Sequence, residues 1–89
     1  MPDVVVSENV SGPAIDALGR EFDVDFAPDL WKSADALRER LRTARALIVR
    51  NQTQVTAEVL AAAPRLLVVA RAGVGFDNID VAAAISAGV

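Results

Sequence analysis

Runs of apolar residues alternate along the chain with segments of helical periodicity. Apolar, mostly β-branched or leucine-rich runs occur at 3–6, 46–49 and 66–70, and such runs predict strands that are buried on both faces of a sheet. The segment 22–26 differs, because Phe and Val alternate there with Asp. This alternation is typical of a half-exposed edge strand. Four strands are therefore expected.

Segments with helical spacing follow each of these strands. Each is expected to begin at a residue whose side-chain oxygen can accept a backbone N–H of the first turn. These expected N-caps are Ser11, Ser33, Thr56 and Asn78, and Gly88 is expected at the end of the last helix. Strands that alternate with helices predict an α/β fold, in which a mostly parallel sheet has helices on both faces.

Composition narrows the class of protein. The chain has 89 residues, enough for one small domain, and 53% of them are apolar, so a globular domain is expected. The net charge is −3 and the basic residues are scattered, which argues against a nucleic-acid partner. No apolar run approaches the length that a bilayer requires, and the N-terminus lacks the features of a signal peptide. A cytoplasmic location without a membrane partner is expected.

Two residue types are missing from the chain, and their absence limits its chemistry. Without Cys the chain can have neither a disulfide nor a thiolate metal site, and without His it lacks the commonest general base and metal ligand. No metal site is expected.

The segment VVARAGVGFDNIDVAAA, residues 68–84, carries two glycines spaced as G-x-G between an expected strand and an expected helix. It is not a dinucleotide-binding fingerprint, because the third glycine position is occupied by Asn78 and the loop follows the fourth strand rather than the first. Two alternatives remain. Gly73 and Gly75 either present backbone N–H groups to an anion at a helix N-terminus or only permit a tight turn.

Two arginines strengthen the first alternative. Arg50 and Arg71 each follow a predicted buried strand directly, and the carboxyl ends of parallel strands meet at one edge of a sheet, where ligands bind. A guanidinium offers a planar fork of donors suited to a carboxylate or phosphate. The sequence therefore predicts an anion site at this edge, although an isolated arginine at a strand end is more often a solvated charge.

The segments LIVRNQTQVTAEVL and RAGVGFDNID carry a resemblance to a known family. From residue 46 to 89 the chain closely resembles the N-terminal, substrate-binding domain of the D-isomer-specific 2-hydroxyacid dehydrogenases, and over 1–44 the likeness is looser. The resemblance implies a flavodoxin-like parallel sheet, truncated here after the fourth βα unit. It also implies an NAD-dependent oxidoreductase whose substrate is a 2-hydroxy acid, phosphorylated or not.

The resemblance assigns roles to particular residues. The loop of Gly73, Val74 and Gly75 would donate backbone N–H groups to the substrate carboxylate, and Val74 would also contact NAD. Arg50 and Arg71 would line the substrate side. The family's catalytic residues and its glycine fingerprint lie beyond residue 89. The chain is thus expected to be a partial substrate-binding domain, with no catalytic residue and no activity of its own.

Other functions are considered beside this one. A stand-alone receiver-type signalling module needs a paired-acid metal cluster after the first strand, where SEN offers one acid. A non-catalytic anion-binding module would use the same loops without chemistry. A homo-oligomer is expected. The strand at 66–70 would form an unpaired apolar sheet edge, through which the isolated chain would either oligomerise or aggregate.

Overall fold

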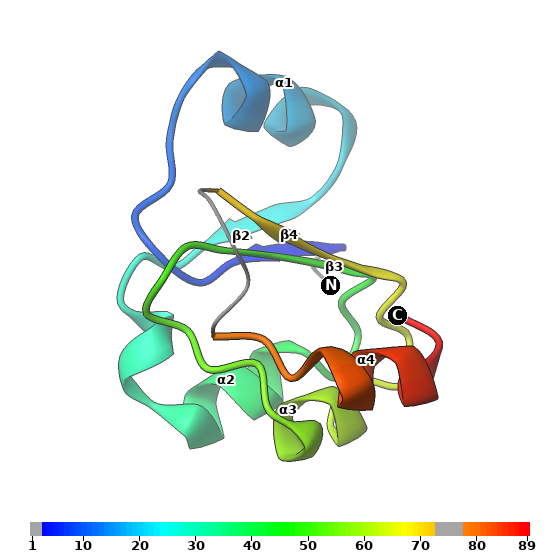
Figure 1. The fold of residues 1–89 in the computed structure, drawn as a ribbon. Coiled ribbons are helices and arrows are strands. Elements are labelled where there is room, and N and C mark those ends of the chain that lie inside the picture. Colours follow the sequence, from blue (N-terminus) through cyan, green and yellow to red (C-terminus); the bar gives the residue numbers. More distant parts are fainter. Residues whose placement is uncertain (1–2, 73–77) are drawn as a thin grey trace.

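The computed structural model describes residues 3–72 and 78–89 and shows a four-stranded parallel sheet (Figure 1). The strands lie in the order β2-β1-β3-β4. Their bounds are β1 Val4–Val6, β2 Val24–Phe26, β3 Ala46–Val49 and β4 Val68–Arg71. This order is that of a flavodoxin-like sheet, and the expected α/β fold and the edge position of β2 are confirmed.

The helices are divided unequally between the two faces of the sheet (Figure 1). Helix α1 alone lies on one face, at the top of the picture, and α2, α3 and α4 cover the other. Their bounds are α1 Pro13–Glu21, α2 Ala34–Arg40, α3 Ala57–Ala61 and α4 Val81–Ala87, and a 3-10 turn, η1, spans Leu30–Lys32. No helix in the described part of the chain is long and apolar enough to cross a membrane.

The main core lies between the sheet and the helices α2, α3 and α4, which cover one of its faces. The parallel register places Val5 beside Leu47, and Leu47 beside Val69, so these side chains share that face. Leu41 and Val59 pack against them. The buried strand residues are mainly β-branched, which is typical of strands in parallel sheets.

The helix starts confirm two of the four expected N-caps. Ser33 accepts a hydrogen bond from the N–H of Ala36 at the start of α2, and Thr56 accepts one from Val59 at the start of α3. The expectation for Ser11 is wrong, because Gly12 with φ 138° occupies the cap position of α1 and no side chain caps it. The two remaining expectations, Asn78 as an N-cap and Gly88 as a helix end, both concern α4.

Helix α4 begins two residues later than expected. Asp80, not Asn78, caps it by accepting the N–H of Ala83 at 3.0 Å. Asn78 is held elsewhere, as described below. The expected end is confirmed, since Gly88 has φ 78°, a left-handed conformation that favours glycine.

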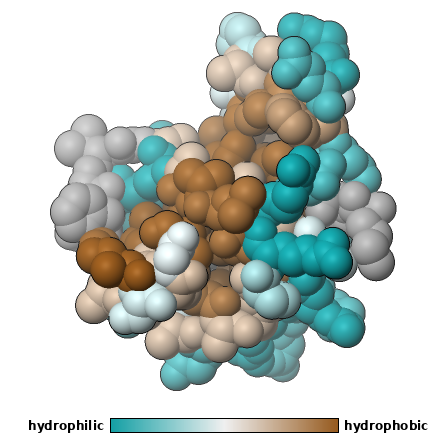
Figure 2. Space-filling view, turned by 90° about the vertical axis from the view of Figure 1, so that its right-hand side faces the viewer, coloured by the Kyte–Doolittle hydropathy of each residue, from teal (hydrophilic) through white to brown (hydrophobic). Residues whose placement is uncertain are grey.

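The face of the sheet below α1 is only partly covered. Val4 and Val6 are buried there, but Val68 is 50% exposed and the preceding Leu67 is 67% exposed. The fourth strand is therefore not buried as expected, and it spans Val68–Arg71 rather than the expected 66–70. A cavity of about 230 Å³ separates Leu18 and Phe22 from this edge. Figure 2 shows apolar side chains gathered below the protruding top of the molecule.

Candidate functional site

Three loops meet at the carboxyl edge of the sheet, because the parallel strands all end there. Ser7 and Glu8 follow β1, residues 50–53 follow β3, and β4 ends in Arg71. Asn78 lies at the same edge, where its backbone carbonyl accepts a hydrogen bond from the N–H of Val55 at 2.8 Å. We call this group of residues the edge network: Ser7, Glu8, residues 50–53, Arg71 and Asn78.

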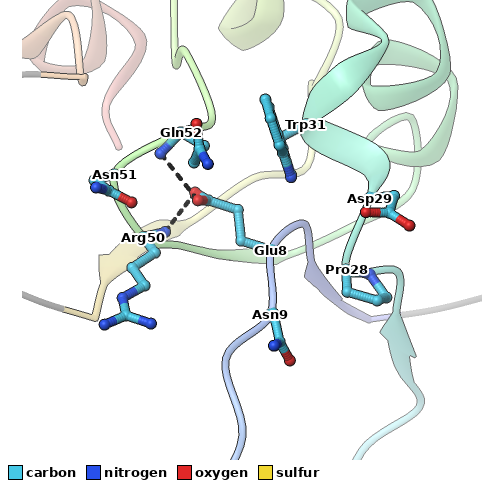
Figure 3. Close-up of a pocket in the computed structure, with 8 residues that line it drawn as sticks. All are labelled: Glu8, Asn9, Pro28, Asp29, Trp31, Arg50, Asn51 and Gln52. Atoms are coloured by element: carbon cyan, nitrogen blue, oxygen red, sulfur yellow. Dashed lines mark hydrogen bonds between the residues drawn. The ribbon is translucent and has the colours of Figure 1, made fainter.

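Glu8 is the centre of the edge network (Figure 3). Its side chain is almost fully buried, with 3% of the residue exposed. Its carboxylate accepts the backbone N–H groups of Arg50 at 2.6 Å, Gln52 at 2.9 Å and Thr53 at 3.0 Å. The Thr53 hydroxyl donates a fourth hydrogen bond at 2.8 Å. Each carboxylate oxygen therefore has at least one donor, as a buried charge requires.

These hydrogen bonds decide the ionisation of Glu8. Burial raises the pKa of a carboxyl group, whereas the hydrogen bonds donated by Thr53, Arg50 and Gln52 lower it, and together they hold the pKa of Glu8 below its ordinary value. Glu8 is thus a carboxylate at neutral pH, and it adds a buried negative charge to an edge that the sequence predicts to bind anions.

Asn78 links the two arginines predicted from the sequence. Its side-chain amide donates to the backbone carbonyl of Arg50 at 2.9 Å and to that of Thr53 at 2.7 Å. Its side-chain oxygen accepts the Nε–H of Arg71 at 2.9 Å. Asn78 is itself buried, with 6% exposed. The structure therefore brings Arg50 and Arg71 to one edge, joined through a single side chain.

The side chains of the two arginines are held differently. Arg71 is half-buried and uses its Nε–H on Asn78. Arg50 is exposed, and its guanidinium points away from Glu8 (Figure 3). Within residues 3–72 and 78–89, that guanidinium has no hydrogen-bond or ion-pair partner. Its donors are free to take a ligand.

Two hollows flank Arg50. One, of about 310 Å³, is lined by Asn9, Val10, Ser11, Arg50 and Ala72. The other, of about 420 Å³, lies on the side of Glu8 and Trp31 (Figure 3). Both open at the carboxyl ends of the strands, where ligands bind in open α/β sheets. No group of three or more acidic side chains in the described residues could hold a metal ion.

Sequence reasoning located only part of this site. Gly73, Val74 and Gly75, the predicted carboxylate-binding loop, lie outside the described residues. The roles of Glu8, Thr53 and Asn78 were missed. The available signal for Glu8 was an acid placed directly after a buried strand, at an edge where every polar group must find a partner.

Comparison with known proteins identifies the family. The family model described as D-isomer specific 2-hydroxyacid dehydrogenase, catalytic domain, matches residues 4–89. The chain belongs to this family. The D-3-phosphoglycerate dehydrogenase of Mycobacterium leprae (strain TN) is 46% identical over 91 residues, which cover 100% of this chain. The (S)-sulfolactate dehydrogenase of Chromohalobacter salexigens is 45% identical over 81 residues, or 91% of this chain.

A solved structure agrees with this assignment. The crystal structure of a D-isomer specific 2-hydroxyacid dehydrogenase from Polaromonas sp. JS6 66, described as NAD-binding, superposes with a TM-score of 0.82 at 31% identity. The match covers 100% of this chain and 28% of that one. The chain spans 16% of the length of the mycobacterial relative and 26% of the sulfolactate dehydrogenase.

Proposed function

We propose that this chain is the substrate-binding part of an NAD-dependent D-2-hydroxyacid dehydrogenase, and that the whole protein oxidises D-3-phosphoglycerate to 3-phosphohydroxypyruvate in serine biosynthesis. The observation that carries the proposal is the exposed guanidinium of Arg50, anchored through its backbone at the carboxyl edge of a family-typical sheet. The 46% identity to a D-3-phosphoglycerate dehydrogenase supports the choice of substrate.

The described residues suit the anionic substrate. Arg50 supplies a fork of donors for a carboxylate or phosphate, and Asn9 and Ser11 line the same hollow with further polar groups. Arg71 is proposed to bind the substrate on the neighbouring strand, and Gly73, Val74 and Gly75 to hold its carboxylate. These residues bind and orient the substrate, which is the protein's share of cofactor chemistry.

The hydride step needs groups that this chain does not supply. A bound NAD would supply the acceptor for the hydride of C2 of the 2-hydroxy acid, and a base would have to take the hydroxyl proton. The chain has no His to act as that base. We propose that NAD is held mainly by a domain outside this chain, with Val74 in contact with it. We also propose that the enzyme is cytoplasmic and homo-oligomeric.

A second substrate is favoured by a specific comparison. Sulfolactate, the substrate named for a relative of 45% identity, carries a sulfonate where 3-phosphoglycerate carries a phosphate ester. Both molecules combine a 2-hydroxy carboxylate with a second anionic group. Two arginines at one edge fit this class of doubly anionic 2-hydroxy acids better than they fit a plain 2-hydroxy acid.

The test uses a protein that contains this chain together with the family's nicotinamide-binding domain. NADH formation is measured with 3-phosphoglycerate, sulfolactate and D-lactate. Arg50→Ala and Arg71→Ala are compared with Arg65→Ala, a matched control because Arg65 is exposed before the amino end of β4. Loss of one charge-assisted contact is expected to raise the KM for 3-phosphoglycerate about tenfold or more, with little change for D-lactate.

The outcomes separate the alternatives. A preference for sulfolactate over 3-phosphoglycerate would replace the substrate but retain the class. Equal effects of Arg50→Ala and Arg65→Ala on the KM of every substrate would contradict the proposal of an anion site at this edge. The 89-residue chain by itself is expected to form no NADH from any of the three substrates.

A further inference from the structure

The loop after β3 forms a nest of backbone donors that is already occupied. The N–H groups of Arg50, Gln52 and Thr53 converge on one carboxylate. Converging N–H groups of this kind ordinarily bind phosphates and other anions. Here Glu8 takes the place of such a ligand, so the loop contributes its Arg50 side chain to the cleft rather than its backbone.

Arg50 is fixed on both sides of its peptide backbone. Its N–H donates to Glu8 at 2.6 Å, and its carbonyl accepts from Asn78 at 2.9 Å. The two partners belong to different loops, one after β1 and one before α4. A side chain whose backbone is held from two directions leaves the sheet in a defined direction, which is how a binding site is preorganised.

We propose that Glu8 is a positioning residue, an internal carboxylate whose hydrogen bonds to residues 50–53 aim the guanidinium of Arg50 at the anionic group of the substrate. The inference rests on the proposed function, since it assumes that Arg50 binds an anion. It goes beyond that function by giving a role to a buried acid whose carboxylate oxygens accept the N–H groups of the loop after β3.

Two effects of Glu8 on anion binding have opposite signs. As a charge, Glu8 repels an anion at Arg50, so its neutralisation would tighten binding. As a positioning residue, it orders Arg50, so its removal weakens binding, because a small misplacement of a binding group is costly. The sign of the change in affinity therefore decides between the two effects.

The experiment compares Glu8→Gln with Asp29→Asn in the 89-residue chain. Both residues line the same hollow and both changes remove one negative charge, but Asp29 is exposed and forms an ion pair only with Lys32 among the described residues. Inorganic phosphate and D-glycerate are the probes, and binding is followed by NMR. We expect Glu8→Gln to raise the Kd for phosphate at least about fivefold, and Asp29→Asn to leave it unchanged or slightly lower.

A conservative variant and a second readout complete the test. Glu8→Asp retains the charge but shortens the side chain, so it is expected to restore part of the affinity. Relaxation of the Arg50 Nε and amide exchange at Arg50 and Thr53 report the order of the loop without any ligand. Both are expected to show a looser loop in Glu8→Gln, with the exchange of Leu47 in β3 as the internal measure that the sheet remains folded.

Each result has one meaning. Equal or tighter phosphate binding by Glu8→Gln overturns the proposal. If the wild-type chain binds neither probe, the proposed function of this edge fails. The positioning role is then tested without a ligand, by the relaxation of the Arg50 Nε. Unchanged relaxation in Glu8→Gln overturns that role. If Glu8→Gln unfolds, Thr53→Val takes its place. It removes the hydroxyl that donates to Glu8 and is also hydrogen-bonded to Ser7. It is expected to raise the Kd by a smaller factor, and no change overturns the proposal.

Discussion

The two faces of the sheet contrast sharply, although the strands offer apolar side chains to both. On the face of α2, α3 and α4, Val5 and Leu47 are fully buried. On the face of α1, Val68 and Phe26 stay largely exposed. The strand sequence alone does not decide which face is covered, because that depends on where each connecting segment passes.

The helix ends follow the same contrast. The three helices on the covered face each have a side-chain N-cap, Ser33, Thr56 or Asp80. Helix α1 has none, and none of its residues is buried. Since helices this short depend on tertiary packing and caps, the covered face should unfold as one unit, and α1 should contribute little to it.

The largest expected effect on stability is the difference between substitutions on the two faces of the sheet. Leu47→Ala should lower the free energy of unfolding by about 2–5 kcal/mol, because it opens a cavity in the core. Val68→Ala should lower it by less than about 1 kcal/mol, because the side chain is already half in water. Urea denaturation followed by circular dichroism measures both. Similar losses would show that the open face is covered in solution.

The pH dependence of the free energy of unfolding distinguishes the contribution of Glu8 in the edge network from that of the core. Glu8→Gln should cost about 1–3 kcal/mol at pH 7, because it disrupts hydrogen bonds to a buried charge. The folded pKa of Glu8 is lowered, so its contribution is complete above the unfolded pKa of about 4.3 and is lost as the pH falls through the folded pKa.

The measurement is the free energy of unfolding as a function of pH below pH 6. The wild-type chain should lose stability at the acid end, and Glu8→Gln should lose less over the same range. Leu47→Ala is the control, because it should lower the whole curve without changing its slope. Parallel curves for the wild type and Glu8→Gln would contradict the assigned ionisation of Glu8.

The caps provide a smaller test of the contrast. Thr56→Ala should destabilise the chain by about 1 kcal/mol, since it leaves the N–H of Val59 without its acceptor. Ser11→Ala should have almost no effect, because Gly12 occupies the cap position of α1. Thermal unfolding of the two variants measures the difference. An equal loss from Ser11→Ala would mean that Ser11 caps α1 in solution.

The smallest effect on stability comes from charging the open edge. Val68→Lys should change the free energy of unfolding by less than about 0.5 kcal/mol but reduce self-association, because β4 is an apolar edge of the described sheet. Ala61→Lys is the matched control, because Ala61 is exposed at the end of α3. Light scattering over a range of concentrations measures association. A wild-type chain that stays monomeric would contradict the expectation that β4 forms an oligomer contact.

The sequence predicted the elements better than their surroundings. Four strands and two N-caps followed from local patterns, because β-branched runs and capping residues act within a few positions. The strand order followed from the flavodoxin-like fold that the family resemblance implies. The exposure of Val68 did not follow, since it depends on the path of α1. The hydrogen bond from Arg50 to Glu8 spans 42 positions, and no local pattern indicates which acid fills a distant loop.

The separation between Glu8 and its partners also bears on the time at which the site forms during synthesis. The carboxylate leaves the ribosome early, but its donors lie 42–45 positions later, and Asn78 is later still. Contacts so distant in sequence form slowly, because a long loop must close first. A nascent chain that ends before Arg50 therefore carries Glu8 as an acid without its backbone donors, and one that ends before Asn78 lacks the side chain that holds the carbonyl of Arg50. Competence to bind an anion should thus arise in a late step of folding, after most of the sheet has been synthesised.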